Sequence, residues 1–145
     1  MKLVRAAVAL SALASVTFVS GTAFAQSQPL KSGEQIYKET CVVCHGTGLL
    51  AAPKLADNKA WAELIKEPQA VLTADGWVGV RNMPAKGGRP DLSLEEFSRA
   101  VAYMARAVGA KWADPDAALM KQIQAEEKKA LDKKAKEAKE TKGKK

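Results

Sequence analysis

The chain has 145 residues, the length of one domain, and its 23 basic and 16 acidic side chains give a formal net charge of +7. So basic a balance first suggests a nucleic-acid or membrane-surface partner. Residues 1–25 carry +2 of this charge, residues 26–120 are neutral, and residues 121–145 carry the remaining +5. Because the middle of the chain has no excess charge, the sequence argues against a globular nucleic-acid-binding domain.

The two cysteines, Cys41 and Cys44, and the single histidine, His45, limit the chemistry further. Two cysteines three positions apart cannot form a disulfide framework. One histidine excludes a Cys2His2 zinc finger and an HExxH metalloprotease helix. A zinc site with four ligands would need a carboxylate from elsewhere to join these three residues.

The first 25 residues have the three parts of a secretory signal peptide. Lys2 and Arg5 form a positive start, residues 6–19 are mostly apolar, and Ala23-Phe24-Ala25 is a small-residue cleavage site. The apolar run is shorter than the roughly 20 residues of a membrane-spanning helix; an uncleaved N-terminal anchor is the alternative. We therefore expect cleavage after Ala25 and a soluble mature protein of 120 residues in the periplasm.

Three short helices are predicted in the first half of the mature chain. Ser32 begins a capping box, which predicts a helix to about Thr40. Asp57 is a good N-cap for the second helix. Pro68 ends that helix or begins the third, and the third stops at Asp75-Gly76, a glycine C-cap signal.

The second half contains a glycine-rich loop and two further helical segments. Residues 79–91 are irregular because glycines and prolines interrupt them. Ser93 starts a second capping box, and an apolar stripe then follows on a helix that ends at Gly109. Asp114-Pro115-Asp116 can start a last segment, with proline at the first helical position, that is helical or disordered. No alternating strand pattern is present, so the predicted class is all-α.

The segment Cys41-Val42-Val43-Cys44-His45 has the form C-x-x-C-H, the attachment sequence of c-type haem. Two thiols one helical turn apart can add to the two vinyl groups of one haem, and the imidazole of the next residue then lies under the iron. A thioredoxin-like dithiol is the alternative, but that fold needs a βαβ context, which this helical sequence lacks. We therefore expect one covalent haem c, attached through Cys41 and Cys44.

His45 is the only histidine and is the predicted proximal iron ligand. Its other ring nitrogen needs a hydrogen-bond acceptor, for which the carbonyl of Pro53 is a candidate. Three methionines remain in the mature chain for the opposite side. Met104 lies on the apolar helix stripe and Met120 near the C-terminal segment, whereas Met83 lies in a glycine-rich loop where no stripe explains it. Met83 is therefore the predicted sixth ligand; a gap-filling Met83 with an open sixth site is the alternative.

Residues 32–108 resemble a monohaem class I cytochrome c, close to the cytochrome c5 type. The matching positions are 33, 37, 41–45, 52–55, 61, 83–88, 92–93 and 100–104. The resemblance implies helices wrapped around one covalent haem, Met83 as an axial ligand and Pro53 as the support of the proximal histidine. It also implies that Gly33 lets the last helix of the haem domain cross closely beneath Tyr103.

The sequence departs from the family pattern in several places. Ala56 stands where many relatives have glycine, and Glu63-Leu64-Ile65 stands where many have an arginine. The second cysteine pair of some cytochromes c5 is missing, and the lysine-rich segment after residue 120 lies outside the resemblance. The residues expected to attach the haem and bind its iron are all present. The departures affect what the resemblance implies about the contacts of the haem propionates and about the redox partner.

We therefore expect a leader at 1–25, a haem domain at 26–112 and a Lys/Glu/Ala-rich helical or disordered tail at 113–145. The side chains expected to pack on the haem are Tyr37, Leu55, Trp77 and Met104. The tail is either solvated surface or an electrostatic docking element for an acidic protein or anionic membrane. Its removal is expected to leave the haem spectrum unchanged.

The predicted function is one-electron transport by a monomer that converts no substrate, so the protein is not expected to be an enzyme. Its expected partners are redox proteins, such as a cytochrome reductase and a terminal oxidase or reductase, in small transient contacts. Nucleic acid is not an expected partner. The alternatives are a haem subunit of a larger complex and a haem catalyst or ligand binder with an open sixth site.

Overall fold

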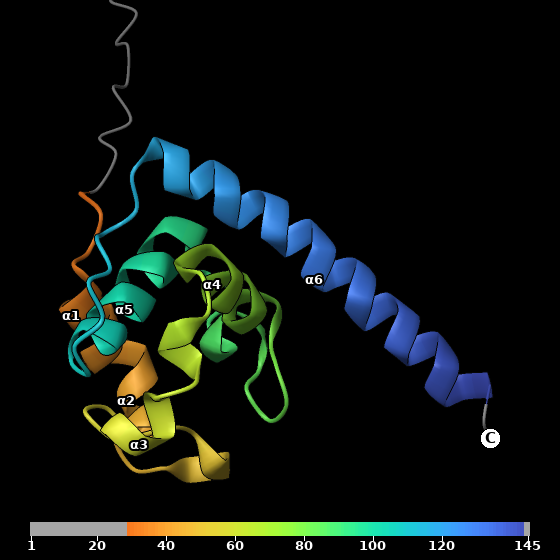
Figure 1. The fold of residues 1–145 in the computed structure, drawn as a ribbon, viewed down its shortest axis with the longest axis horizontal. Helices are drawn as coiled ribbons and strands as arrows, with labels where there is room; N and C mark the ends of the chain where they lie inside the picture. The colour runs from red at the N-terminus through yellow and green to blue at the C-terminus, as the bar shows by residue number, and fades with distance from the viewer. Residues whose placement is uncertain (1–28, 144–145) are drawn as a thin grey trace, which may run out of the picture.

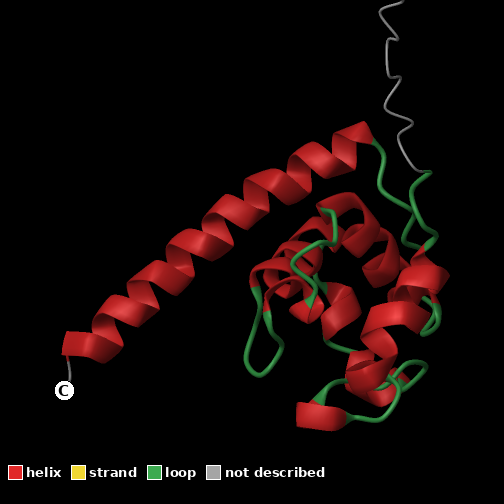
Figure 2. Cartoon of the chain, turned by 180° about the vertical axis from the view of Figure 1, so that it is seen from behind, coloured by secondary structure: helices red, strands yellow, loops and turns green. Residues whose placement is uncertain are grey.

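The computed structural model describes residues 29–143, which consist of helices joined by loops (Figures 1 and 2). No strand occurs in that range, so the all-α prediction is confirmed. The predicted leader, residues 1–25, lies outside the described residues. The helical elements are α1 (Gly33–Ile36), a π-helical turn (Tyr37–Cys41), α2 (Val42–His45), a 3-10 turn (Leu49–Ala51), α3 (Asn58–Trp61), a 3-10 turn (Leu64–Lys66), α4 (Gln69–Val78), a 3-10 turn (Ala85–Gly88), α5 (Leu94–Arg106) and α6 (Ala117–Gly143).

The first helical run continues through the cysteine pair. The Ser32 hydroxyl accepts a hydrogen bond from the backbone N–H of Gln35 at 3.2 Å, which is one half of the predicted capping box. The predicted end near Thr40 is too early, because α1, the π-helical turn and α2 follow one another without a break to His45. Gly46 still has a right-handed backbone, and the first left-handed residue after the run is Gly48, with φ of 84°.

Two other helices begin where the sequence predicts. The Asp57 carboxylate accepts hydrogen bonds from the backbone N–H groups of Lys59 and Ala60 at 3.1 and 3.0 Å. At the start of α5, the Ser93 hydroxyl accepts from the N–H of Glu96, and the Glu96 carboxylate accepts from the N–H of Ser93. These caps satisfy backbone donors that have no partner inside a helix.

The end of α4 differs from the prediction. The helix does not stop at Asp75-Gly76 but continues to Val78, and Gly79, with φ of 85°, ends it. Gly76 serves packing instead, since a Cβ there would lie 3.2 Å from the ring of Phe97. A glycine that allows close approach of a neighbouring element looks the same in sequence as a glycine that ends a helix.

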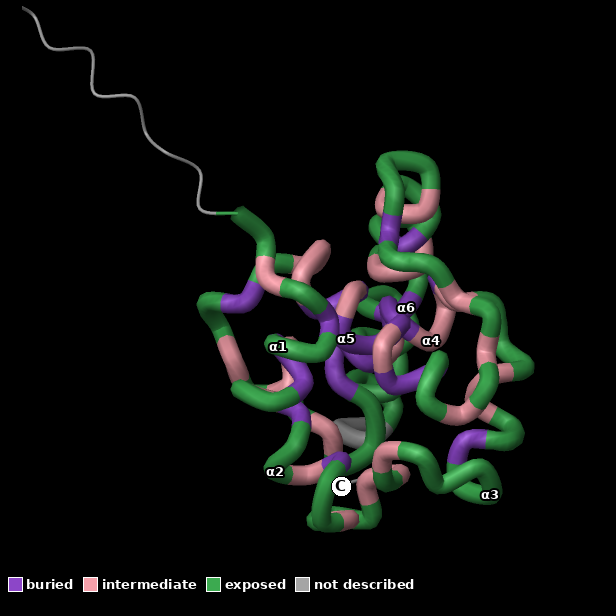
Figure 3. The backbone as a smooth tube through the Cα atoms, turned by 90° about the vertical axis from the view of Figure 1, so that its left-hand side faces the viewer, coloured by how far each residue is buried: buried purple, intermediate pink, exposed green. Residues whose placement is uncertain are grey.

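The buried residues concentrate on α5 and on the adjoining sides of α1 and α4 (Figure 3). α1 and α5 cross closely at Gly33, where a Cβ would lie 2.1 Å from the carbonyl oxygen of Arg99 and 3.0 Å from Cβ of Tyr103. Next to this crossing the rings of Tyr37 and Tyr103 lie 5.5 Å apart. The crossing therefore depends on a residue without a side chain.

The C-terminal segment is predicted to be helical or disordered. It forms the long helix α6 (Figure 1). Its first N–H groups are capped by Asp116, whose carboxylate accepts from the N–H of Leu119 at 2.8 Å. The helix therefore begins after Pro115, which does not occupy the predicted first helical position.

α6 packs along α4 over its first half and then projects beyond the body of the fold (Figure 1). Ile123 is completely buried and Ala130 is 8% exposed, whereas every residue from 131 to 140 is exposed. The expectation of a merely solvated tail is therefore wrong for this first half. Between residues 29 and 143, no helix combines the length and the apolar composition needed to cross a bilayer.

Replacing Gly33 by alanine is expected to destabilise the fold strongly, because the new methyl group meets the backbone of α5. We expect a loss of about 3 kcal/mol or more, measured by thermal unfolding of the holoprotein. Gly109→Ala is the matched control. Nothing lies within 4 Å of a Cβ there, so its cost is limited to the left-handed backbone, about 1 kcal/mol. Equal losses for the two variants would contradict the crossing.

Candidate functional site

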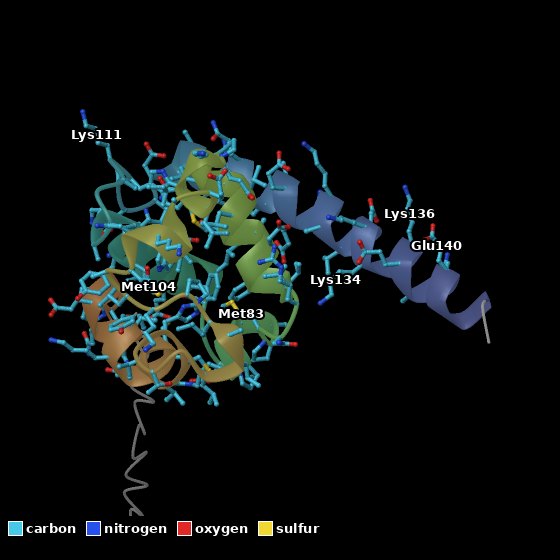
Figure 4. The ribbon with its side chains drawn as sticks, turned by 60° about the horizontal axis from the view of Figure 1, so that its bottom comes forward. Met83, Met104, Lys111, Lys134, Lys136 and Glu140 are labelled. Atoms are coloured by element: carbon cyan, nitrogen blue, oxygen red, sulfur yellow. The ribbon has the colours of Figure 1, made fainter. Side chains whose placement is uncertain are left out.

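The predicted attachment and ligand residues surround one cavity of about 220 Å³. Cys41, Cys44 and His45 contribute to one side from the end of the first helical run. Met83 and Met104 also line it, from the loop after α4 and from α5 (Figure 4). Three separated parts of the chain therefore bring two thiols, an imidazole and two thioethers to one space.

The His45 side chain is held in one orientation. Its ring Nδ1–H donates a hydrogen bond to the carbonyl oxygen of Pro53 at 2.9 Å. The backbone N–H of Leu55 donates to the His45 carbonyl at 2.7 Å, and the Trp61 indole N–H donates to the carbonyl of Lys54 at 2.8 Å. Because Nδ1 carries the proton, the lone pair of Nε2 is left available to a metal.

A strained turn returns the chain from His45 to Pro53. Gly48, Leu50 and Ala51 have φ of 84°, 56° and 60°, in the left-handed region. Leucine and alanine adopt this conformation at a cost, so the surrounding contacts must hold them there. Backbone strain in non-glycine residues gives no signal in sequence patterns, and this turn could not be predicted.

The Cys41 thiol differs from the attacking thiol of a redox-active dithiol. Burial, with a further contribution from neighbouring Cys44, raises the pKa of the Cys41 thiol to about 11. Disulfide oxidoreductases instead lower the pKa of the attacking cysteine. A zinc site also lacks support, since residues 29–143 contain no cluster of three or more His, Cys, Asp or Glu side chains that could hold a metal ion.

Hydrogen bonds connect the Met83 loop, residues 79–88, and the residue that follows it to the strained turn and to the first helical run. Met83 is half-buried, and its backbone N–H donates to the carbonyl of Val80 at 2.9 Å. The Asn82 side chain donates to the carbonyl of Leu50 at 3.3 Å, which links the loop to the strained turn. Just after the loop, the Arg89 guanidinium donates to the Thr40 hydroxyl at 3.2 Å.

The predicted packing residues divide between the cavity and the core. Met104 lines the cavity, whereas the described contacts of Tyr37, Leu55 and Trp77 lie in the adjoining core. The Tyr37 ring packs against Tyr103 at the α1–α5 crossing. Leu55 packs against the core and holds His45 through its backbone. Trp77 is turned toward Phe97 and α6, with its ring 5.4 Å from that of Phe97.

Trp61, Leu64 and Phe97 also line the cavity, and none of them is among the predicted site residues. Phe97 belongs to the apolar stripe of α5, and such a stripe indicates burial without showing what the buried side chain touches. Trp61 is among the positions that carry the family resemblance, which is the one signal that could have found it.

The residues present fit a c-type haem. The cavity carries paired thiols on one wall, an imidazole nitrogen left free by the Pro53 hydrogen bond, and the Met83 thioether from another element. The remaining wall is largely apolar, as a macrocycle requires, and includes Leu72, Val101 and Met104.

Comparisons with known proteins agree with this arrangement. A family model described as "Cytochrome C oxidase, cbb3-type, subunit III" matches residues 28–104. A cytochrome c-555 of Chlorobaculum thiosulfatiphilum is 42% identical over 77 residues, which cover 50% of this chain and 90% of that protein. A cytochrome c5 of Azotobacter vinelandii is 37% identical over 76 residues, which cover 51% of this chain and 92% of that protein.

Among solved structures, the chain is similar to one reported as "Crystal structure of electron transfer complex of nitrite reductase with cytochrome c". The TM-score is 0.51 and the identity 38%. The match covers 57% of this chain and 99% of the other.

Proposed function

Because the chain belongs to the class I cytochrome c family, whose members are electron carriers rather than enzymes, we propose that it carries single electrons in the periplasm between respiratory redox proteins. The observation that carries the proposal is the cavity in which His45, oriented by Pro53, and Met83 meet beside both cysteines. When bound, the haem supplies an iron that gains and loses one electron.

In this proposal the residues of the cavity have distinct roles. Cys41 and Cys44 would hold the haem through thioethers, and His45 Nε2 and the Met83 sulfur would bind its iron. The Pro53 carbonyl fixes the tautomer of His45 and makes its Nε2 a better donor to the metal. A thioether ligand favours the ferrous state and raises the reduction potential, which suits electron transport.

An exposed apolar rim at the mouth of the cavity supports contact with a protein partner. Leu49, Leu50 and Val80 all line the cavity and are 51%, 56% and 41% exposed. A small apolar patch favours a brief encounter rather than a permanent complex. The similar solved structure names a nitrite reductase as the partner of its cytochrome c, which supports redox enzymes in general as partners.

Met83→Ala tests the ligation. We expect the purified ferric protein to lose the weak long-wavelength sulfur-to-iron absorption band, and the ferrous protein to bind carbon monoxide readily. The reduction potential should fall on the order of 0.1 V, a fraction of the roughly 0.8 V range that axial ligands span.

Met104→Leu is the matched control, because Met104 also lines the cavity but lies 3% exposed in the core. Leucine keeps its volume without the sulfur, so the absorption band should persist. Loss of the band in Met104→Leu but not in Met83→Ala would reassign the ligand. A wild-type protein without the band would favour a haem catalyst or ligand binder with an open sixth site.

Export is tested by the N-terminus of the protein from a periplasmic extract. Cleavage after Ala25 predicts a mature chain that begins at Gln26 and carries the mass of one covalent haem, as mass spectrometry can show. An intact Met1 in the membrane fraction would instead indicate an uncleaved anchor.

The description of the matching family favours a second candidate, a haem subunit of a larger assembly, because it names a subunit of an oxidase. Size-exclusion chromatography of the native extract separates the two candidates. A free carrier is expected to elute as a monomer of roughly the chain mass, 15.5 kDa less the leader. Co-elution with an oxidase would replace the proposal by the second candidate.

A further inference from the structure

One face of α6 carries four residues in helical register: Ile123, Glu127, Ala130 and Lys134. Their spacings of four, three and four positions place them in one stripe. Ile123 and Ala130 are buried, as expected for the side that meets α4. The other two are charged, and both reach partners on or directly after α4.

Glu127 holds the indole of Trp77. Its carboxylate accepts a hydrogen bond from the indole N–H at 2.8 Å. The other contacts of this ring lead toward the haem cavity. The Lys86 ammonium of the Met83 loop lies 4.9 Å from the ring centroid, and the ring packs on the edge of Phe97, which lines the cavity. The Met83 loop therefore contacts Trp77 through Lys86, and Trp77 is hydrogen-bonded to Glu127 of α6.

Lys134 binds the chain where the Met83 loop begins. Its ammonium donates to the carbonyl oxygens of Val78 and Gly79 at 2.7 and 3.0 Å. A cation is favourable at these carbonyls, because they end α4 and lack helical partners. The loop folds back on the same spot, since a Cβ at Gly79 would lie 2.7 Å from the backbone nitrogen of Ala85 and 3.0 Å from the carbonyl oxygen of Met83.

The Met83 loop needs support from outside. Arg81, Lys86, Gly87 and Gly88 all have positive φ, two of them without being glycine. Such backbone persists only where neighbouring contacts hold it. α6 supplies such contacts at the beginning of the loop and behind Trp77. α6 begins at Ala117, beyond the residues that the family model matches, so this support is an addition to the family domain.

We propose that α6 braces the Met83 loop, with Lys134 and Glu127 as positioning residues that hold the sixth ligand against exchange. This inference rests on the proposed ligation by Met83. It replaces the expectation that the C-terminal segment can be removed without effect on the haem. α6 contacts the beginning of the loop, at Val78 and Gly79. Loss of these contacts should therefore favour any ligand that displaces the Met83 sulfur.

The test is a titration of the full-length ferric holoprotein with imidazole, followed by loss of the sulfur-to-iron absorption band. In Lys134→Met, which keeps an unbranched side chain but removes the ammonium group and its charge, imidazole should bind about tenfold more tightly, since two charge-assisted hydrogen bonds are lost. Lys134→Arg should restore most of the wild-type affinity. Glu127→Leu should shift the affinity in the same direction as Lys134→Met.

Lys136→Met is the matched control, because it removes the same charge from α6. Lys134 lies on the side of α6 toward the body, whereas Lys136 and Glu140 lie on the opposite side (Figure 4). Its imidazole affinity should stay within about twofold of the wild-type value. Ser93→Ala, which removes the cap of α5, controls for a general loss of stability and should leave the affinity similarly unchanged.

Equal affinities in Lys134→Met and Lys136→Met would overturn the brace, and so would an increase in Ser93→Ala as large as that in Lys134→Met. Either result would leave the ligation by Met83 standing, provided that the wild-type protein shows the band. A wild-type protein without the band would overturn the ligation and the brace together.

Discussion

The hydrogen bond from His45 to the Pro53 carbonyl is the contact on which the candidate site depends. It commits one ring nitrogen, Nδ1, and leaves the lone pair of Nε2 available in a fixed direction to a metal. To bring Pro53 back, the chain must pass through left-handed residues at Leu50 and Ala51. The bonds of Leu55 to the His45 carbonyl and of Trp61 to the Lys54 carbonyl hold the returning segment in place.

The part of the cavity wall that contains Met83 is built differently. Met83 lies in a loop with several positive φ values, whose regular structure is limited to the 3-10 turn Ala85–Gly88. The loop is therefore positioned by its neighbours: Asn82 bonds to the strained turn, Arg89 bonds to Thr40, and α6 holds the end of α4. These side-chain hydrogen bonds join two walls of the cavity that come from distant parts of the sequence.

Some of the charged residues in the C-terminal segment stabilise the fold. Residues 121–145 carry the excess of basic residues, but Lys134 and Glu127 are used to fasten α6 to α4. Lys136 and Lys139 lie on exposed turns of the projecting end of α6. One helix thus contributes to the packing of the domain and carries the basic surface of the chain.

Sequence patterns predicted those structural features that are fixed by residues close together in the chain. The caps at Asp57 and Ser93 were found because a capping side chain bonds within three residues. The C-x-x-C-H pattern and the glycine-rich surroundings of Met83 identified the same cavity residues from composition and spacing alone.

Contacts between distant segments decided the rest. Gly76 was mistaken for a helix end because its role, to admit Phe97, involves a residue 21 positions away. The Trp77 indole bonds to Glu127, 50 positions away, and Ile123 is buried on the helix that packs along α4. The helical class, the C-x-x-C-H motif and the candidate ligands follow from residues that lie close together in the chain. Which apolar side chains face the cavity, and the packing of the basic C-terminal helix along α4, follow only from the folded chain. Burial depends on partners from distant segments, and local patterns do not contain them.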